Sequence, residues 1–437
     1  MISREARTAV FIVALFLCYI ANRRTIPFLY GGDTIPARLI PFSVLGFGRL
    51  TLDPFRYNME AAGGYRWYIK ERDGHLISFY PIGAALVALP VYVPAYVALA
   101  ATGPVTRARL FAFAPVVEKI AASFIAALCC ALVFLLALGR APPRVAAGAA
   151  ITLGLASSMW ATASQGLWPH GPVALMILAA FWLLEAPYRT SWSVAGAGFA
   201  LAMAVITRPT AALFAVAACA AILSGTGSLA ARLRRASPFV LGALPVVAFN
   251  AGYNWTFYQN PVGPYGGLIG RLALAGMGEG VAGLLVSPNR GLLVFTPIAV
   301  LGLVGIGRAI LQRGRDPLLA LFSMASLAHT AIVGSYVEWA GGWSFGPRYL
   351  VDVLPILAIA GAEMWPLMRP AWRRLAWTAI AWSLLVQLNG AFIYPASGWN
   401  ARMSAIGLER AAWDWRHFSL WEDQAAWWRL GKDAPRF

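Results

Sequence analysis

Long apolar runs recur along the whole chain of 437 residues, and short polar turns separate them. Many of these runs approach the ~20 residues that a helix needs to cross a bilayer. The pattern therefore predicts an all-α polytopic membrane protein with about eleven transmembrane helices. The predicted spans are residues 8–22, 115–138, 145–161, 169–186, 192–207, 209–224, 237–255, 291–311, 317–336, 348–367 and 372–392.

Arginines gather in the turns that fall on the N-terminal side of the membrane in this threading. Short loops rich in Lys and Arg face the cytoplasm. We therefore expect the N-terminus in the cytoplasm and the C-terminus on the opposite side. The turns concerned contain Arg140 and Arg144, Arg189, Arg232, Arg234 and Arg235, Arg308, Arg313 and Arg315, and Arg369, Arg373 and Arg374.

One apolar run, from Pro81 to Ala101, does not fit this alternation. If it crossed the membrane, every later turn would change sides and the basic clusters would face outward. Pro90 and Pro94 also make it a poor straight spanning helix. We expect it to be a juxtamembrane or re-entrant helix inside a long first external loop, residues 23–114.

The remaining organisation is simple. Residues 1–392 are expected to form a single transmembrane domain, and residues 393–437 a short external tail that is rich in tryptophan. An interfacial helix lying on the membrane is the favoured interpretation of this tail. A role in substrate binding stays open.

Composition supports a membrane protein and argues against a nucleic-acid partner. Apolar types make up 59% of the residues and charged types only 12%, against about a quarter charged in soluble domains. Lys and Arg (35) exceed Asp and Glu (18), but the basic residues sit in the turns and form no continuous basic face. The four cysteines lie inside apolar runs without metal-type spacing, and we expect neither a metal nor a cofactor.

Polar motifs that interrupt the apolar pattern emerge almost entirely on the predicted outer side. Loops that share one side are expected to line a single cavity there. An activated sugar donor outside the cytoplasm is expected to be lipid-linked, because nucleotide sugars are confined to the cytoplasm; no P-loop or Asp-x-Asp motif is present. The motifs are Gly31–Thr34 with Arg38, Ser164–His170, Asn260–Gly266, Ser287–Gly291 and Glu338–Tyr349.

Transfer from such a donor needs a carboxylate to accept the acceptor's proton. It also needs cations or amide donors on the departing phosphate, and aromatic faces for the sugar. Residues of these types on the outer side are Asp33, His170, Arg290, Arg348, Trp339 and Trp343.

At these residues the chain resembles the membrane-embedded GT-C glycosyltransferases, specifically the bacterial kind related to the dolichyl- and polyprenyl-phosphate-sugar enzymes and to the aminoarabinose transferases. The resemblance implies an inverting transferase of the bacterial inner membrane, with juxtamembrane helices in the first external loop over residues 36–48 and 81–101. The motifs that carry it, in order, are GGDTIPARLIPF, SFYPIGAALVALP, SQGLWPHGP, LLVSPNRGLLVFTP and EWAGGWSFGPRYLVDVLP.

The resemblance also implies a catalytic aspartate in the first external loop, and Asp33 matches it. Many relatives carry a second acidic residue beside that aspartate, whereas this chain has Thr34. The metal-dependent branch is therefore disfavoured. Asp33 has an alternative role as the N-cap of a helix that starts near Ile35.

The other candidates are expected to bind the donor or the acceptor, and each has a structural alternative. Arginines near span ends can extend to lipid phosphates instead, Trp and Tyr can anchor in the aromatic belt, and Glu338 can pair with Arg348. Expected at the donor phosphate or elsewhere on the substrate are Arg208, Arg290, Arg348, His170, Gln165 and Tyr349. Expected to contact the sugar or acceptor are Trp339, Trp343 and Glu338.

The leading hypothesis is transfer of a sugar from a polyprenyl-phosphate donor to a glycan, lipid or protein acceptor outside the cytoplasm. A membrane transporter or lipid flippase is the alternative from another class. That alternative predicts inverted repeats and ionisable or helix-breaking residues near mid-membrane, and the sequence offers neither clearly. A non-catalytic assembly subunit with the same fold is a third, more distant hypothesis.

Overall fold

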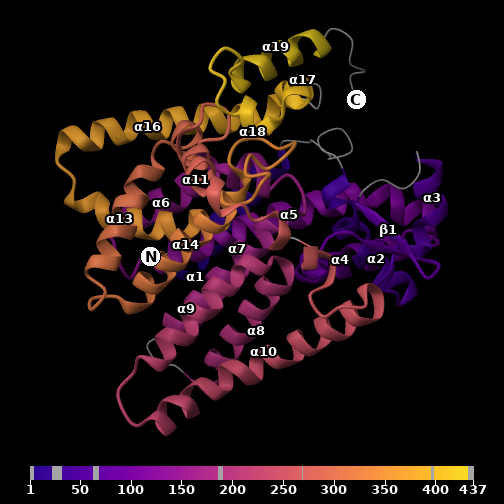
Figure 1. The fold of residues 1–437 in the computed structure, drawn as a ribbon, viewed down its shortest axis with the longest axis horizontal. Coiled ribbons are helices and arrows are strands. Elements are labelled where there is room, and N and C mark those ends of the chain that lie inside the picture. Colours follow the sequence, from indigo (N-terminus) through magenta and orange to yellow (C-terminus); the bar gives the residue numbers. More distant parts are fainter. Residues whose placement is uncertain are drawn as a thin grey trace.

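The structure, a computed structural model, describes residues 4–21, 32–62, 68–185, 190–267, 269–394 and 398–431. Residues 23–31 of the predicted first external loop, Arg189, and residues 432–437 of the tail lie outside the described residues. The architecture is a helical bundle with one small β-hairpin (Figure 1).

Each predicted span coincides with helical structure, which confirms the predicted all-α polytopic class. Within the described residues, five helices could cross a membrane by length and composition alone: Gly83–Ala101, Arg107–Ala137, Leu229–Tyr258, Pro317–Gly334 and Pro370–Ile393. The helices over the predicted spans are α1 (Arg4–Ala21), α5 (Arg107–Ala137), α6 (Pro143–Leu155), α7 (His170–Glu185), α8 (Ser191–Thr207), α9 (Ala212–Leu223), α10 (Leu229–Tyr258), α12 (Leu292–Phe295) with α13 (Ala299–Leu311), α14 (Pro317–Gly334), α15 (Leu354–Met364) and α16 (Pro370–Leu388).

In its described residues the first loop contains three α-helices and a hairpin: α2 (Ile35–Phe47), α3 (Arg56–Ala61), β1 (Ile69–Arg72), β2 (His75–Ser78) and α4 (Gly83–Ala101). The strands pair antiparallel around Asp73 and Gly74, which both have positive φ. Such a two-residue Asp-Gly turn is a preferred hairpin connection. Arg72 ties the hairpin to the end of α10 by donating to the Tyr258 carbonyl at 2.9 Å.

α1 and α5 run antiparallel, since Phe11 packs near Phe134 and Phe16 near Phe124. The segment between them therefore begins and ends at the same end of the bundle and makes an even number of crossings. A single crossing by α4 is then ruled out by parity, which favours the juxtamembrane interpretation of that helix.

A cluster of charges joins the helix ends at one end of the bundle. Arg140, just past α5, pairs with Glu185 at the end of α7, with Asp316 before α14 (2.7 Å) and with Glu363 in α15 (3.6 Å). We call these four residues the basal ion cluster, and their end of the bundle the basal end. His170 and Glu185 bound α7, so the opposite end lies about 24 Å away.

The C-terminal tail folds over the opposite end. It contains α17 (Trp399–Met403), α18 (Leu408–Ala411) and α19 (Ser419–Gly431), which lie with α11 (Met277–Val286) far from the turn between α9 and α10 (Figure 1). Trp399 is fully buried, with its indole nitrogen donating to the His417 carbonyl at 2.7 Å. The tail is thus a packed layer rather than an isolated helix.

Candidate active site

Asp33 stands in a short 3₁₀ turn, Gly32–Thr34, directly before α2. Its carboxylate accepts a hydrogen bond from the Arg348 guanidinium at 3.1 Å. The N-cap position of α2 belongs to Thr34, and no side chain caps the helix there. The helix-cap alternative for Asp33 therefore does not match its surroundings, because its carboxylate is directed at an arginine 315 positions away.

Arg348 follows the glycine-rich segment after α14. Its guanidinium lies 4.7 Å from the centroid of the Trp168 ring and 5.3 Å from that of Tyr349, within cation–π range. The side chain is only 11% exposed. Among the described residues its Nε–H has no hydrogen-bond partner. Arg348 therefore offers a buried, oriented donor beside Asp33.

Two tyrosines complete the wall around Asp33. Burial and the neighbouring Asp33 carboxylate, to which the Tyr80 hydroxyl is hydrogen-bonded, raise the pKa of Tyr80. Burial also raises the pKa of Tyr265, with Tyr349 and Asp33 adding to the effect against Arg208 and Arg348. Both hydroxyls are therefore neutral at physiological pH and can donate hydrogen bonds.

Behind Tyr349 lies a second group of charged side chains, Arg208, His170, His329 and Asp352, which we call the Asp352 cluster. Arg208 pairs with Asp352, and His170 Nδ1 lies 3.0 Å from the other Asp352 oxygen. His329 Nε2 is 3.6 Å from Asp352. Asp352 and both histidines are almost fully buried.

Tyr349 connects the two groups. Its ring centroid lies 5.1 Å from the Arg208 guanidinium and 5.3 Å from that of Arg348. Arg208 has extended backbone at the end of α8, as expected for a residue before proline. This conformation lets its side chain leave the helix toward Tyr349. The predicted residues Asp33, Arg348, Arg208, His170 and Tyr349 thus lie together.

Gln165 lies on the loop that carries Trp168, in a buried network that fixes this loop. Its Oε1 accepts from Lys119 Nζ at 2.9 Å, and its Nε2 donates to the Trp160 carbonyl at 2.8 Å. On the neighbouring position of α5, Glu118 accepts from the Leu167 amide at 3.0 Å. The loop that carries Trp168 is therefore anchored to α5.

Glu118 also reaches the other side of the site. It pairs with Arg38 of α2 at 3.5 Å and is hydrogen-bonded to the side chain of Thr34. One buried carboxylate thus joins the turn of Asp33 to the loop of Trp168.

Arg290 occupies a different place from Arg348. Its side chain is 1% exposed and donates to the carbonyls of Asn289, Ala340 and Gly342 at 3.0, 2.8 and 3.2 Å. It also bonds Asn400 and lies over the Trp399 ring. No contact within the described part of the chain joins it to Asp33. Arg290 holds the glycine-rich segment to the C-terminal tail.

The remaining candidates lie at the rim or behind it. Glu338 is 59% exposed and pairs with Arg271 at 3.3 Å, so its ion-pair partner is not Arg348. Trp339 is buried, with its ring near Gly283 and 6.4 Å from that of Trp413. Trp343 is 43% exposed.

Sequence reasoning missed several residues of the site, namely Tyr80, Trp168, Tyr265, His329 and Asp352. Tyr80, Trp168, Tyr265 and Asp352 lay inside the motifs already noted. An acidic residue inside a predicted span implies a charged partner, so Asp352 could have been found by that signal. His329 lies inside α14 and the predicted span 317–336, where an ionisable side chain carries the same signal.

Comparison with known proteins gives similarity at the level of structure. No family model matches the sequence, and no curated protein matches it. The crystal structure of ArnT from Cupriavidus metallidurans bound to undecaprenyl phosphate aligns with 98% of this chain and 78% of its own, with a TM-score of 0.52 and 13% identity. The apo state of ArnT gives a TM-score of 0.50 over the same shares.

The chain has the GT-C fold. The predicted polytopic GT-C-like architecture is therefore confirmed. The oligosaccharyltransferase AglB from Archaeoglobus fulgidus, in complex with an inhibitory peptide and a dolichol-phosphate, aligns with 94% of this chain and 56% of its own, at 13% identity and a TM-score of 0.44. Within the described residues of this GT-C fold, no group of three or more His, Cys, Asp or Glu side chains is arranged to hold a metal ion.

Proposed function

We propose that this protein is an inverting glycosyltransferase that moves a sugar from a polyprenyl-phosphate donor to an acceptor outside the cytoplasm. The observation that carries the proposal is the Asp33–Arg348 pair, a carboxylate and a guanidinium 3.1 Å apart at one end of the bundle. The same fold in ArnT was crystallised with undecaprenyl phosphate. A glycan, a lipid or a protein remains open as the acceptor.

Asp33 is the proposed general base. The acceptor hydroxyl oxygen forms a bond to the anomeric carbon as the bond from that carbon to the phosphate oxygen breaks. The hydroxyl proton goes to the Asp33 carboxylate, and the polyprenyl phosphate leaves with the bonding electrons. Attack opposite the leaving group inverts the anomeric configuration.

Arg348 is the proposed partner of the departing phosphate. Its Nη1 already donates to Asp33, while its buried Nε–H has no hydrogen-bond partner in the described residues. A guanidinium can therefore bridge the base and the phosphate, and it stabilises charge that develops on the leaving oxygen. The neutral hydroxyl of Tyr265, close to both arginines, supplies a further donor.

Arg208 is proposed to bind the phosphate from the other face of Tyr349. Its positive charge is held by Asp352, which in turn contacts His170 and His329. In this proposal Asp352 and His170 are positioning residues, because they orient Arg208 and are themselves buried. Arg290 and Gln165 are likewise proposed as positioning residues. Arg290 holds the loop of Arg348, and Gln165 holds the loop of Trp168.

The aromatic side chains are proposed to shape the sugar and acceptor sites. Tyr349 and Trp168 flank Arg348, where a sugar attached to the phosphate would lie. Trp343 lies on the loop of Arg348 and is partly exposed, so it suits an acceptor contact. Trp339 supports the loop from behind, and Glu338 is left at the outer rim.

The assay that tests this function uses the purified full-length protein in lipid nanodiscs with a polyprenyl-phosphate-linked sugar. Asp33→Asn keeps the shape but cannot accept the proton, so turnover should fall by roughly 10²–10⁴-fold. Asp53→Asn is the matched control in the same external loop, since Asp53 contacts Thr51, His75 and Leu76 instead of Arg348. Near wild-type transfer by a normally folded Asp33→Asn variant would place the base elsewhere.

The proposal also requires the site to face away from the cytoplasm. Single cysteines at two exposed positions, Arg234 near the start of α10 and Ser404 in the tail, test this in intact cells. An impermeant thiol reagent should label Ser404→Cys and leave Arg234→Cys unlabelled. The reverse pattern would refute the outward-facing site.

A further inference from the structure

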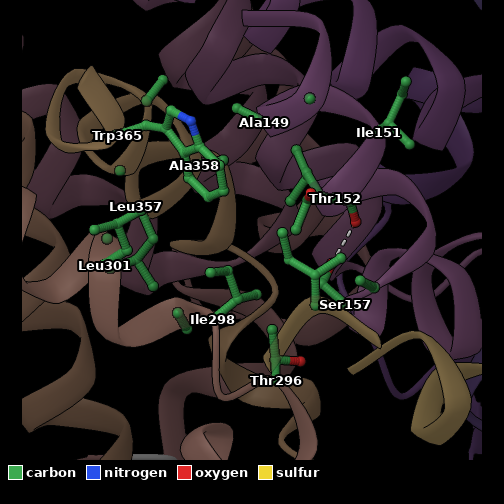
Figure 2. A pocket seen from close by; sticks show the side chains of 18 of the residues that line it. Ala149, Ile151, Thr152, Ser157, Thr296, Ile298, Leu301, Leu357, Ala358 and Trp365 are labelled. Carbon is green, nitrogen blue, oxygen red and sulfur yellow. Dashed lines mark hydrogen bonds between the residues drawn. The ribbon is translucent and has the colours of Figure 1, made fainter. Parts of the chain in front are cut away.

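A cavity of about 430 Å³ lies among the helices, bounded by α6, α13, α15 and α16. Figure 2 shows apolar side chains along its walls, among them Ile151, Leu301, Leu357 and Trp365. We call this cavity the α6–α15 groove. It contains none of the residues assigned to Asp33, Arg348 or the Asp352 cluster.

Small residues create the groove. Gly148, Ala149, Ala358 and Gly361 line it, so the facing helices leave space where larger side chains would meet. A Cβ added at Gly148 would have no heavy atom within 4 Å. The groove follows α6 from Arg144 to Leu155, about 17 Å along the helix axis.

The two ends of the groove differ in charge. Arg144, Trp365 and Trp377 lie at the basal end, whereas Ser157 and Thr296 line the far end. Trp365 and Thr296 are at opposite ends of the view in Figure 2. The Trp365 and Trp377 rings contact edge to face with centroids 5.4 Å apart, as in an interfacial aromatic belt.

Arg144 marks the basal mouth as a site for an anion. Arg140, four residues earlier in the turn between α5 and α6, is surrounded by three carboxylates. Arg144 is exposed and has no ion pair among the described residues. Arg373 lies nearby, since its guanidinium donates to the Pro366 carbonyl at 3.1 Å beside Trp365.

We propose that the α6–α15 groove binds one acyl chain of an anionic phospholipid, with the lipid phosphate at Arg144. An apolar groove of this length between spanning helices suits hydrocarbon, because most of its lining side chains offer no hydrogen-bond partner to water. The unpaired arginine and the tryptophans at the basal end select a headgroup at that membrane surface. A polyprenyl phosphate is disfavoured, because the groove's cationic mouth is at the end opposite Asp33.

Native mass spectrometry of the full-length protein tests the proposal, with phosphatidylglycerol and phosphatidylcholine offered in equal amounts. Wild type should retain phosphatidylglycerol preferentially. Gly148→Leu fills the groove and should lose most of the retained lipid. Gly307→Leu is the matched control, because Gly307 is also a helical glycine with nothing within 4 Å of an added Cβ, and it does not line the groove.

Headgroup selection is tested separately with Arg144→Gln. One arginine near an anionic headgroup is worth about fivefold in affinity, so the preference for phosphatidylglycerol over phosphatidylcholine should fall by about that factor. Retention of lipid by Gly148→Leu equal to that of Gly307→Leu would overturn the proposal. Displacement of the retained lipid by polyprenyl phosphate would also overturn it, by assigning the groove to the donor.

Discussion

The two ends of the helix bundle each carry a group of charged side chains, and the two groups are built differently. At the basal end, one arginine, Arg140, meets three carboxylates that are 19 to 32% exposed. At the other end, Asp33 and Arg348 form a pair that is 14 and 11% exposed, backed by the nearly fully buried Asp352 cluster. Aromatic rings surround the group that contains Asp33 and Arg348, whereas the group around Arg140 is formed where helices end.

The difference fits a structural role for the group around Arg140 and the substrate-binding role proposed for the group around Asp33. The donors of Arg140 are used by Asp316, by its neighbouring carboxylates and by the Leu136 carbonyl at 2.9 Å. In the group around Asp33, the buried Arg348 Nε–H has no hydrogen-bond partner among the described residues. The same is true of His329 Nδ1 in the Asp352 cluster. A buried polar atom without a partner costs about 1–3 kcal/mol. Such a cost is expected where a ligand supplies the missing partner.

The sharpest test of the comparison changes the arginine at each end in the same way. Arg348→Ala should reduce donor turnover by roughly 10²–10³-fold, the usual loss for a donor to a developing oxyanion. Arg348→Lys should restore it only in part, because an ammonium lacks the planar fork. Steady-state transfer rates at varied donor concentration measure both effects.

Arg140→Lys is the control for that experiment. It replaces a guanidinium by an ammonium at the basal end, as Arg348→Lys does at the other end. It should leave the transfer rate of the folded protein unchanged. Equal losses of activity in Arg348→Lys and Arg140→Lys would mean that both groups act through the fold alone.

Asp352→Asn tests whether the buried half of the site positions Arg208. Leaving Arg208 without its charged partner should raise the KM for the donor about tenfold with a smaller change in kcat, equivalent to about 1.4 kcal/mol of binding. A purely structural role predicts lower thermal stability with unchanged KM. Asp352→Glu, which keeps the charge, should recover part of the donor affinity.

Arg140→Gln tests the basal ion cluster itself. It leaves Glu185, Asp316 and Glu363 close together without a cation, so the free energy of unfolding should fall by about 1–3 kcal/mol. Because these carboxylates are partly exposed, screening limits the loss. Thermal unfolding at low and high salt should show a smaller difference from wild type at high salt. An unchanged unfolding temperature at low salt would contradict a stabilising role for the cluster.

The smallest effect concerns the hairpin that borders the site. Burial alone would raise the pKa of Asp53, but hydrogen bonds from the Leu76 amide, His75 and Thr51 outweigh it and lower the pKa. The carboxylate therefore stabilises the hairpin above its ordinary pKa near 3.8, and this contribution is lost as the pH falls through the lower folded-state pKa. Asp53→Asn should weaken the hairpin by about 1 kcal/mol at pH 7.

Amide hydrogen exchange of residues 68–78 measures that loss, at pH 7 and again below pH 4. The difference between Asp53→Asn and wild type should shrink at the lower pH. A difference that persists unchanged would show that the carboxylate charge is not responsible.

The sequence by itself determined the membrane class and the approximate positions of the helices, and it predicted which ends of the helices face the cytoplasm. Apolar length and the distribution of basic turns are properties of local stretches, so residues 317–336 could be assigned to a helix without knowing their neighbours. Asp33 and Arg348 were also found as candidates, because polar types next to glycine and proline interrupt long apolar runs. Their roles in catalysis stay predictions.

The tertiary structure alone decided which candidates meet. Arg290 and Arg348 both lie within motifs that contain glycine and proline and looked equivalent in sequence, yet Arg290 holds backbone carbonyls and Arg348 holds Asp33. The partners of Asp33 and Arg208 lie 315 and 144 positions away. Pairing over such distances depends on how the helices pack, and no local pattern of residues encodes it.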